Sequence, residues 1–238
     1  MHSAEYARMA SVEDRHWWFR GRLASVRALL KRYVPPGRGL DCSCGTGMTL
    51  SRVAPWVQAG ADLSSLALQH ARARGHKSLM QADLTRLPLR DSSLDLVTCL
   101  DTLEHVPDDA AALSEISRVL VPGGHALFTV PAHPWMFSAH DRALHHVRRY
   151  TYFELRGKVQ AAGFNIRRFS WLNCLLLPPV AVVRLLRPDR GETASDTEKV
   201  PFSPLNLLLY LLFAAESLPL RFIGLPFGVS LICLARKA

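Results

Sequence analysis

Residues Leu40–Gly47 have the sequence LDCSCGTG, a short apolar run followed by a turn of small residues. The run predicts a strand over 39–42, and the pattern after the turn predicts a helix over 48–54. Small residues let a ligand approach the backbone, and the N-terminus of the following helix presents free N–H groups. In an open α/β sheet such a turn lies at the carboxyl edge, where ligands bind. The turn is not a P-loop, because no Gly-Lys-Ser/Thr follows it.

Strand and helix patterns alternate along most of the chain. Strands are expected over 39–42, 57–63, 77–82, 94–100, 126–130, 164–171 and 227–235, and helices over 3–33, 48–54, 64–75, 108–120 and 151–162. Such alternation predicts an α/β fold with a doubly wound, mostly parallel seven-stranded sheet. We expect an N-terminal helix before the sheet and a helical insert before its last strand.

Three parts of the chain are expected on this basis. Residues 1–38 form an N-terminal helical cap, residues 39–171 and 227–238 form the α/β domain that binds the ligand, and residues 172–226 form an apolar helical insert. The insert holds two apolar runs, 174–186 and 205–215, joined by the polar bridge 187–199. Neither run reaches the ~20 residues of a spanning helix. We expect a cap packed on the sheet, an apolar lid over a lipophilic substrate, or a surface that touches a membrane, and no transmembrane span.

Composition limits the class of protein. The chain has 238 residues, 49% of them hydrophobic and 21% charged, which excludes a disordered or fibrous protein. Its net charge of +9 is uneven, since residues 142–190 carry ten Lys and Arg against two acidic residues. Basic flanks favour an anionic partner such as nucleic acid, a phosphorylated substrate or a membrane surface. Five scattered cysteines without zinc-type spacing, and no signal peptide, predict a reduced, cytoplasmic protein.

Four carboxylates end four successive predicted strands, namely Asp41, Asp62, Asp83 and Asp101. Asp62 follows Asp41 by 21 residues, where an acidic side chain can bind ribose hydroxyls. Each carboxylate alone could cap a helix or a turn. Four in succession at one sheet edge instead indicate a ligand site.

The stretches LDCSCGTG, ADLSSLAL, QADLTRLPLRDSSLDLV and LDTLEHVPD resemble the successive motifs of the class I (seven-β-strand, Rossmann-like) S-adenosylmethionine-dependent methyltransferases, in their small-molecule branch. The resemblance runs from about Leu40 to Val130. It implies S-adenosyl-L-methionine as cofactor, S-adenosyl-L-homocysteine as product and transferase activity.

The resemblance also implies which residues hold the cofactor. Its methionine part would meet Asp41, the turn residues Cys42, Ser43, Gly45 and Gly47, and the backbone of Leu100; its ribose would meet Asp62, and its adenine Leu63, Asp83 and Leu84. The family usually has glycine where this chain has Ser43, so we expect weaker or repositioned binding. The N-terminal stretch HWWFRGR (16–22) resembles a helix that covers the cofactor in a bacterial subset of the family. Trp18 would contribute there or to core packing, and Arg22 would pair with the cofactor carboxylate.

A second group of chemically active residues follows the fifth predicted strand, in PAHPWMFSAHDRALHHVRRY (131–150). Methyl transfer needs a positioned nucleophile and a base that removes its proton, and histidine suits the second task. The candidate catalytic residues are His140, Asp141, His146, Arg149 and Tyr150, with His105 as a further base. The arginines suit a carboxylate or phosphate on the substrate. Two interpretations are weaker: that this stretch is a solvated basic loop, or that it forms a metal site. No H-E-x-x-H pair is present, so we expect no metal.

The predicted function is methyl transfer from S-adenosylmethionine to a small-molecule acceptor, lipophilic or anionic, with an oxygen acceptor slightly favoured. An RNA or other nucleic-acid methyltransferase is the second hypothesis, since the charge of +9 suits it. The stretch LDTL (100–103) replaces the Asn/Asp-Pro-Pro-aromatic turn of many such enzymes, so nucleic acid is the less favoured partner. The third hypothesis is a non-catalytic protein that binds S-adenosylmethionine or lipid at the membrane periphery.

Overall fold

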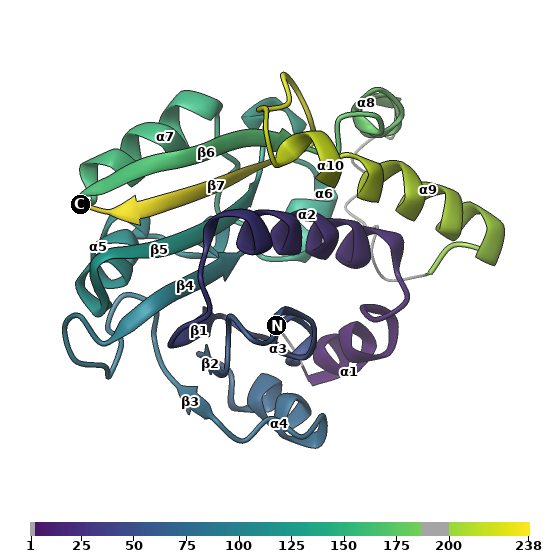
Figure 1. Cartoon of the computed structure of the whole chain (residues 1–238). Helices are drawn as coiled ribbons and strands as arrows, with labels where there is room; N and C mark the ends of the chain where they lie inside the picture. The colour runs from purple at the N-terminus through teal and green to yellow at the C-terminus, as the bar shows by residue number, and fades with distance from the viewer. Residues whose placement is uncertain (1–2, 187–199) are drawn as a thin grey trace.

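A computed structural model of the chain describes residues 3–186 and 200–238, and it contains one seven-stranded sheet of order β3-β2-β1-β4-β5-β7-β6 (Figure 1). The strands are β1 (Gly39–Cys42), β2 (Ala59–Asp62), β3 (Leu79–Gln81), β4 (Leu94–Leu100), β5 (Leu120–Pro131), β6 (Phe164–Leu172) and β7 (Ser230–Lys237). All neighbours pair in parallel except β7, which is antiparallel to both β5 and β6. The prediction of a doubly wound, mostly parallel seven-stranded sheet is confirmed.

Helices cover both faces of the sheet. They are α1 (Ser3–Val12), α2 (Trp17–Tyr33), α3 (Met48–Val53), α4 (Ser65–Ala73), α5 (Asp109–Val119), α6 (Ala139–Ala143), α7 (Tyr152–Ala161), α8 (Leu177–Leu186), α9 (Ser203–Ala215) and α10 (Ser217–Leu220), with short 3-10 turns at Leu103–His105 and Pro134–Met136. Residues of α5 and α7 pack with β4, β5 and β7 into one hydrophobic core. Residues of α2, α3, α9 and α10 form a second core on the other face.

The continuous apolar run of β4 explains its central position. Leu40 pairs with Val97 and Cys42 with Cys99, so the motif strand β1 lies directly beside β4. A parallel strand that is covered by helices on both faces needs apolar side chains on both sides. This arrangement brings the carboxyl ends of β1, β2 and β4 to one edge of the sheet.

The N-terminal helix differs from its prediction. A single helix over 3–33 was expected, but the chain breaks between α1 and α2. His16 has extended backbone, and its Nδ1 accepts a hydrogen bond of 3.2 Å from the amide of Trp18, which caps α2. Glu13 turns inward at the break and contacts Thr46. Apolar periodicity continues through the break, so it could not reveal the cap.

The fifth strand is also longer than the expected 126–130. The predicted helix 108–120 ends at Val119, and β5 begins at Leu120, which pairs with Leu94. Pro122 and the two glycines after it lie within β5 rather than between helix and strand. Gly123 has a φ of +79°, a left-handed conformation that glycine adopts without steric cost.

The apolar insert folds into helices where the structure describes it, and the bridge 187–199 lies outside the described residues. Asn206 ties α9 to the N-terminal segment, since its Oδ1 accepts from the amide of Trp17 at 2.9 Å and its Nδ2 donates to the carbonyl of Arg15 at 2.9 Å. Within the described residues one helical stretch, Ser203–Leu220, is long and apolar enough to cross a membrane. The division of the chain into cap, domain and insert stays a prediction.

Candidate active site

A cavity of about 620 Å³ lies at the carboxyl edge of the sheet. Its walls come from α1, α2, the turn after β1, the ends of β2 and β4, the segments after β3 and β5, and α8. Most predicted site residues line it, namely Trp18, Arg22, Asp41, Cys42, Ser43, Gly45, Asp62, Leu63, Asp83, Leu84, Leu100, His105, His140, His146 and Arg149. A cleft of this size suits one cofactor together with a small substrate.

The turn after β1 is built on left-handed backbone. Ser43, Gly45 and Gly47 have φ values of +60°, +55° and +86°. Gly47 caps α3 and does not line the cavity, whereas the amide of Gly45 donates to Asp62 Oδ2 at 2.9 Å. Ser43 therefore adopts a conformation that costs an L-residue free energy and costs glycine none.

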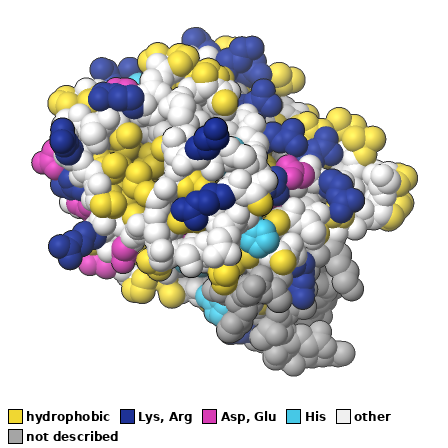
Figure 2. Space-filling model, turned by 90° about the horizontal axis from the view of Figure 1, so that it is seen from below, with side chains coloured by type: hydrophobic (Ala, Val, Ile, Leu, Met, Phe, Trp, Pro, Cys, Tyr) yellow, Lys and Arg dark blue, Asp and Glu magenta, His cyan; other side chains and the backbone are white. Residues whose placement is uncertain are grey.

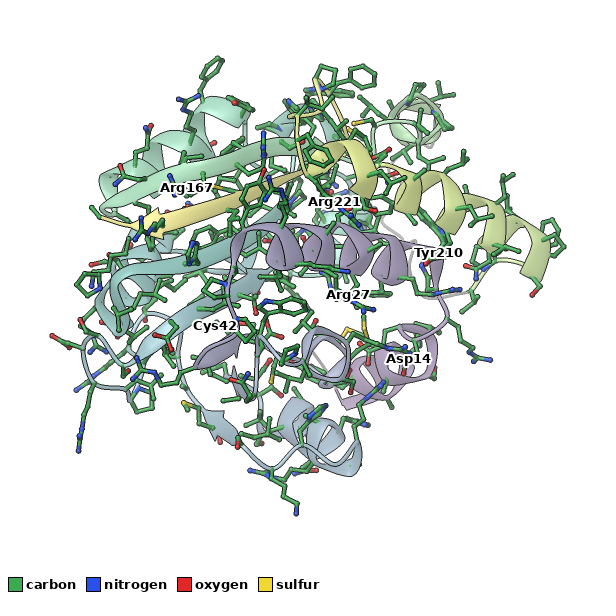
Figure 3. All side chains as sticks on the ribbon, in the orientation of Figure 1. Asp14, Arg27, Cys42, Arg167, Tyr210 and Arg221 are labelled. Carbon is green, nitrogen blue, oxygen red and sulfur yellow. The ribbon has the colours of Figure 1, made fainter. Side chains whose placement is uncertain are left out.

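The cysteines of this turn are buried. Cys42 lies in β1, beneath α2 in the view of Figure 3, and Cys44 is 5% exposed. Burial raises the pKa of both thiols above the ordinary cysteine value. Both are free, and a protonated, enclosed thiol is a poor nucleophile and a poor metal ligand. This favours a packing role for the pair over a redox role.

Asp41 is the most buried acid of the motif. It is 2% exposed, and its Oδ1 accepts a hydrogen bond of 2.6 Å from Thr98 Oγ1. Burial raises the pKa of this carboxyl to about 7. A cation that entered the cavity beside Asp41 would favour its ionised form.

Asp62 ends β2, as predicted, whereas β3 ends at Gln81 and Asp83 follows it by two residues. The surroundings of the two acids also differ. Asp62 is buried and also accepts from the amide of Ser64 at 2.9 Å, and burial raises its pKa. Asp83 is exposed and accepts from the amide of Thr85 at 2.8 Å, which lowers its pKa. The side chains of Leu63 and Leu84 lie beside these acids in the cavity wall.

Arg22 reaches the cavity from α2 and forms an ion pair with Asp101, at the end of β4. Thr129 Oγ1 donates to the other oxygen of this carboxylate at 2.8 Å. The buried Nε of Arg22 has no hydrogen-bond partner among the described residues. The guanidinium therefore retains a donor for a ligand carboxylate.

Glu13 and Thr46 were not predicted as site residues. Glu13, at the end of α1, contacts Thr46 Oγ1 in the turn and accepts from Arg74 Nη2 at 2.6 Å. The same arginine donates to Asp14 at 2.6 Å, so α4 holds the α1–α2 break against the turn. Asp14 is labelled near the α1–α2 break in Figure 3. These contacts join segments more than 30 residues apart, and no local pattern in the sequence indicates them.

The loop after β5 forms a buried charge cluster. His146 Nδ1 lies 2.9 Å from Asp141 Oδ1, and Arg149 Nε donates to the same oxygen at 2.7 Å. Asp141 is fully buried, and its Oδ2 accepts from the amide of Ser138 at 2.9 Å. A carboxylate on Nδ1 fixes the histidine tautomer and leaves Nε2 for chemistry.

Glu104 faces this histidine from the segment after β4. Its Oε1 lies 4.0 Å from His146 Nε2, and neither of its oxygens has a hydrogen-bond partner among the described residues. Burial raises the pKa of Glu104 well above the ordinary value. The ring of His105 packs edge-on against that of His146 at 4.7 Å, and burial lowers the pKa of His105 to about 4.

Glu104, His105 and His146 offer ligand atoms within 4.8 Å of one another, a grouping that the sequence spacing did not suggest. Asp101 acts on Glu104 with negative charge, and Arg22 and Arg149 act on it with positive charge. The geometry of this group therefore allows a metal ion, and charges of both signs surround it.

Tyr150, a predicted catalytic residue, lies outside the cavity. Its hydroxyl donates to the carbonyl of Leu103 at 3.1 Å and to Asp109 Oδ2 at 2.8 Å, and the side chain is fully buried. Burial raises its pKa far above the ordinary tyrosine value. The structure therefore gives Tyr150 a packing position, because its hydroxyl is committed to the protein.

Left-handed backbone at residues other than glycine gathers around the cavity. Six described non-glycine residues have positive φ, and four of them line the cavity: Ser43, Asp101, His145 and Asn173. Such conformations cost about 1–3 kcal/mol each and cluster at functional sites. The buried amide side chain of Asn173 has no partner among the described residues, so it offers a further unpaired polar group.

Parts of this chain are similar in sequence to known proteins. Residues 40–128 match the family model of a methyltransferase domain. A Mycolicibacterium smegmatis protein named as an S-adenosylmethionine-dependent methyltransferase is 31% identical over 161 residues, which cover 65% of this chain and 62% of that protein. A ubiquinone biosynthesis O-methyltransferase of Alkalilimnicola ehrlichii is 33% identical over 147 residues, which cover 54% of this chain and 60% of that enzyme.

A crystal structure of a Thermotoga maritima S-adenosylmethionine-dependent methyltransferase superposes with a TM-score of 0.61 at 19% identity, covering 99% of this chain and 96% of that one. The fold is that of the Rossmann-like methyltransferases. Residues 40–128 carry a methyltransferase domain, and relatives similar to it are named as S-adenosylmethionine-dependent methyltransferase and as O-methyltransferases. The matches of this chain span about three fifths of the first two curated relatives.

Proposed function

We propose that the chain methylates a hydroxyl oxygen of a small, largely apolar acceptor, with S-adenosylmethionine as methyl donor and His146 as base. The observation that carries this proposal is the buried Asp141–His146 pair, whose histidine lines the same cavity as the β1 turn. The family implies the cofactor, and the described residues fit it.

The fit rests on the charged groups in the cavity wall. The Asp41 carboxyl would receive the ammonium group and the unpaired Nε of Arg22 the carboxylate, which are the two charged ends of an amino acid. Asp62 and Asp83 offer carboxylate oxygens to ribose and adenine, between the apolar side chains of Leu63 and Leu84. When bound, the cofactor supplies an electrophilic methyl group on a sulfonium.

His146 is suited to remove the acceptor proton. A hydrogen on Nδ1 donates to Asp141, which leaves the lone pair of Nε2 directed toward Glu104 and the cavity. The carboxylate then stabilises the imidazolium that forms when the hydroxyl proton arrives. In its protonated form, the carboxyl of Glu104 would donate to the acceptor oxygen and hold it near Nε2.

Two observations favour an apolar acceptor bearing a hydroxyl. The cavity that His146 lines also has the apolar side chains of Val106, Leu144 and Val180 in its walls. Several relatives are named ubiquinone biosynthesis O-methyltransferases, which supports oxygen as the accepting atom. Basic residues of the 131–150 loop give weaker support to an anionic acceptor, since Asp141 and the carbonyl of Ala132 already engage Arg149.

The test is a product assay with isotope-labelled S-adenosylmethionine and matched acceptors that carry the same alkyl chain and end in a phenol, an aniline or a carboxylate. We expect label in the phenol, and a loss of about 10²–10⁴-fold in turnover for His146→Ala. His70→Ala is the control, because His70 lies on α4 outside the cavity. Preferential labelling of the aniline, or full activity of His146→Ala, would contradict the proposal.

A further inference from the structure

The exposed face of α9 is apolar and uncharged. Its sequence, SPLNLLLYLLFAA, has no Asp, Glu, Lys or Arg. Leu207, Leu208 and Leu211 are each more than half exposed, although water solvates leucine poorly. A helix face exposed to water normally carries charged or polar side chains.

The same face continues beyond α9. Leu218 in α10 is 60% exposed and follows Leu211 by 7 residues, which is helical spacing. Phe222 and Ile223, in the turn after α10, are 66% and 58% exposed. We call the exposed apolar side chains of this stretch the apolar face: Leu207, Leu208, Leu211, Leu218, Phe222 and Ile223. Exposed apolar side chains gathered on one stretch indicate a binding surface for a protein or a membrane.

The opposite side of the helical stretch is fixed to the fold. Asn206, Phe213 and Leu220, spaced seven residues apart, are buried. Phe213 packs so tightly on α2 that a Cβ on Gly21 would lie 2.4 Å from its ring. Because α2 holds the helix on its buried side, the exposed side can lie flat against a surface. This arrangement suits a helix that lies on a membrane rather than one that crosses it.

Cationic side chains border the apolar face. Helix α2 runs beside α9 and carries no acidic residue; of its five Lys and Arg, Arg22 faces the cavity and the other four lie elsewhere on the helix. The guanidinium of Arg20 lies 4.0 Å over the ring of Tyr210 in α9, and Arg27 and Lys31 are exposed farther along α2. Figure 2 shows hydrophobic and basic side chains together at the end of the molecule that α9 forms.

We propose that this apolar face docks in the plane of an anionic lipid bilayer, with α9 and α10 in the headgroup layer and the basic residues of α2 against lipid phosphates. Such docking has two features: apolar side chains that enter the membrane interface, and Lys and Arg side chains beside them. A second copy of this chain fits less well, because its own basic border would meet the same border. The docking surface does not depend on the methyl transfer proposed above.

The position of the cavity gives this docking a consequence. Val180 in α8 lines the cavity, and Val182, two residues further on, is 53% exposed. The loop before α8 is joined to the end of α9, since Glu216 Oε1 accepts from the amide of Leu175 at 3.1 Å. Side chains two residues apart point to opposite faces of a helix, so α8 separates the cavity from solvent beside the end of α9, and an acceptor from the bilayer would enter around α8.

The test is flotation of the full chain with vesicles of phosphatidylcholine alone or with one third phosphatidylglycerol. We expect the protein to float with the anionic vesicles, less with the neutral ones, and less in high salt. The double variant Leu207→Glu/Leu211→Glu should reduce the bound fraction at least about tenfold. Its control is Phe153→Glu, which adds a charge at an 81% exposed phenylalanine of α7, and circular dichroism checks that each variant folds.

Three results would overturn the proposal. The first is that the wild-type chain fails to float with anionic vesicles, or that the double variant floats as well as Phe153→Glu. The second is resistance of the bound protein to alkaline carbonate, which would indicate a spanning helix. The third is a dimer in light scattering that Leu207→Glu/Leu211→Glu converts to a monomer, which would make the apolar face a subunit interface.

Discussion

His146 Nδ1 lies 2.9 Å from Asp141 Oδ1, and the carboxylate of Asp141 is fully buried beneath it. The pair joins the start of a short helix, α6, to the segment five residues later, so the loop itself orients the imidazole. Arg149 Nε donates to the same carboxylate oxygen at 2.7 Å. Because of this relationship we propose His146, among the histidines of the cavity, as the base.

The first prediction compares two histidines that touch each other. His146→Ala should lower the rate of methyl transfer about 10²–10⁴-fold and leave cofactor affinity nearly unchanged. His105→Ala should cost less, because a group with a pKa of about 4 accepts a proton poorly at neutral pH. Single-turnover kinetics with saturating cofactor measures both. A larger loss for His105→Ala would transfer the base role to that residue.

The second prediction concerns pH and Asp41. Burial raises its pKa to about 7, and an ammonium group of the cofactor needs the ionised form. The bound state then holds fewer protons than the free state, so affinity should fall about tenfold per pH unit below 7 and level off above it. Calorimetry in two buffers of different ionisation enthalpy should detect proton release below pH 7. In Asp41→Asn the affinity should be lower and this slope should disappear.

Asp41 should contribute the opposite trend to the stability of the free protein. The pKa of Asp41 is higher in the folded chain than in the unfolded chain, so between about pH 4 and pH 7 the folded state binds the extra proton at this residue. The contribution of Asp41 to the free energy of unfolding should therefore fall as pH rises through this window. Urea unfolding of the wild type and of Asp41→Asn checks this, and an equal slope in the two proteins would contradict it.

The third prediction addresses the departure from the family motif. Ser43 has a φ of +60°, so Ser43→Gly should raise the free energy of unfolding by about 1 kcal/mol. It should also tighten cofactor binding, since it removes a side chain from the turn. Ser43→Ala is the control, because it keeps the Cβ and should not gain stability. Thermal unfolding and calorimetric titration of the three proteins would show whether Ser43 weakens the site.

The fourth prediction uses two glycines in helices. Gly21→Ala should lower the free energy of unfolding by about 1–3 kcal/mol, because its Cβ would overlap the buried Phe213. Gly157→Ala in α7 has no atom within 4 Å of the new Cβ and should instead raise it by about 0.5–1 kcal/mol. Opposite signs in chemical denaturation would confirm that α9 packs closely on α2. A neutral Gly21→Ala would show that it does not.

Local patterns in the sequence predicted the sheet well, because each central strand is a continuous or nearly continuous apolar run bounded by small residues. LDLVTCL gave β4 with its observed bounds, 94–100. The break between α1 and α2 was missed because it depends on a histidine cap and on a buried contact with Thr46. Such contacts form between distant segments and leave no periodic signal.

The candidate site likewise has some features that the sequence predicted and others that it did not. Acids at strand ends were predictable, because the topology brings every parallel carboxyl end to one edge. The roles within the histidine-rich loop were not, since only the fold brings Glu104 within 4.0 Å of His146 and turns Tyr150 into the core. Composition gave no sign that Glu104 is an unpaired buried acid.

The central claim is that the turn after β1 and the acids at the strand ends bind S-adenosylmethionine. Calorimetric titration of the wild type with S-adenosylmethionine and S-adenosylhomocysteine tests it most directly, beside Asp62→Ala and the control Asp95→Ala, whose side chain pairs with Arg38 away from the cavity. We predict saturable one-to-one binding that Asp95→Ala retains and Asp62→Ala loses. Absence of binding in the wild type, or equal binding in both variants, would contradict the account.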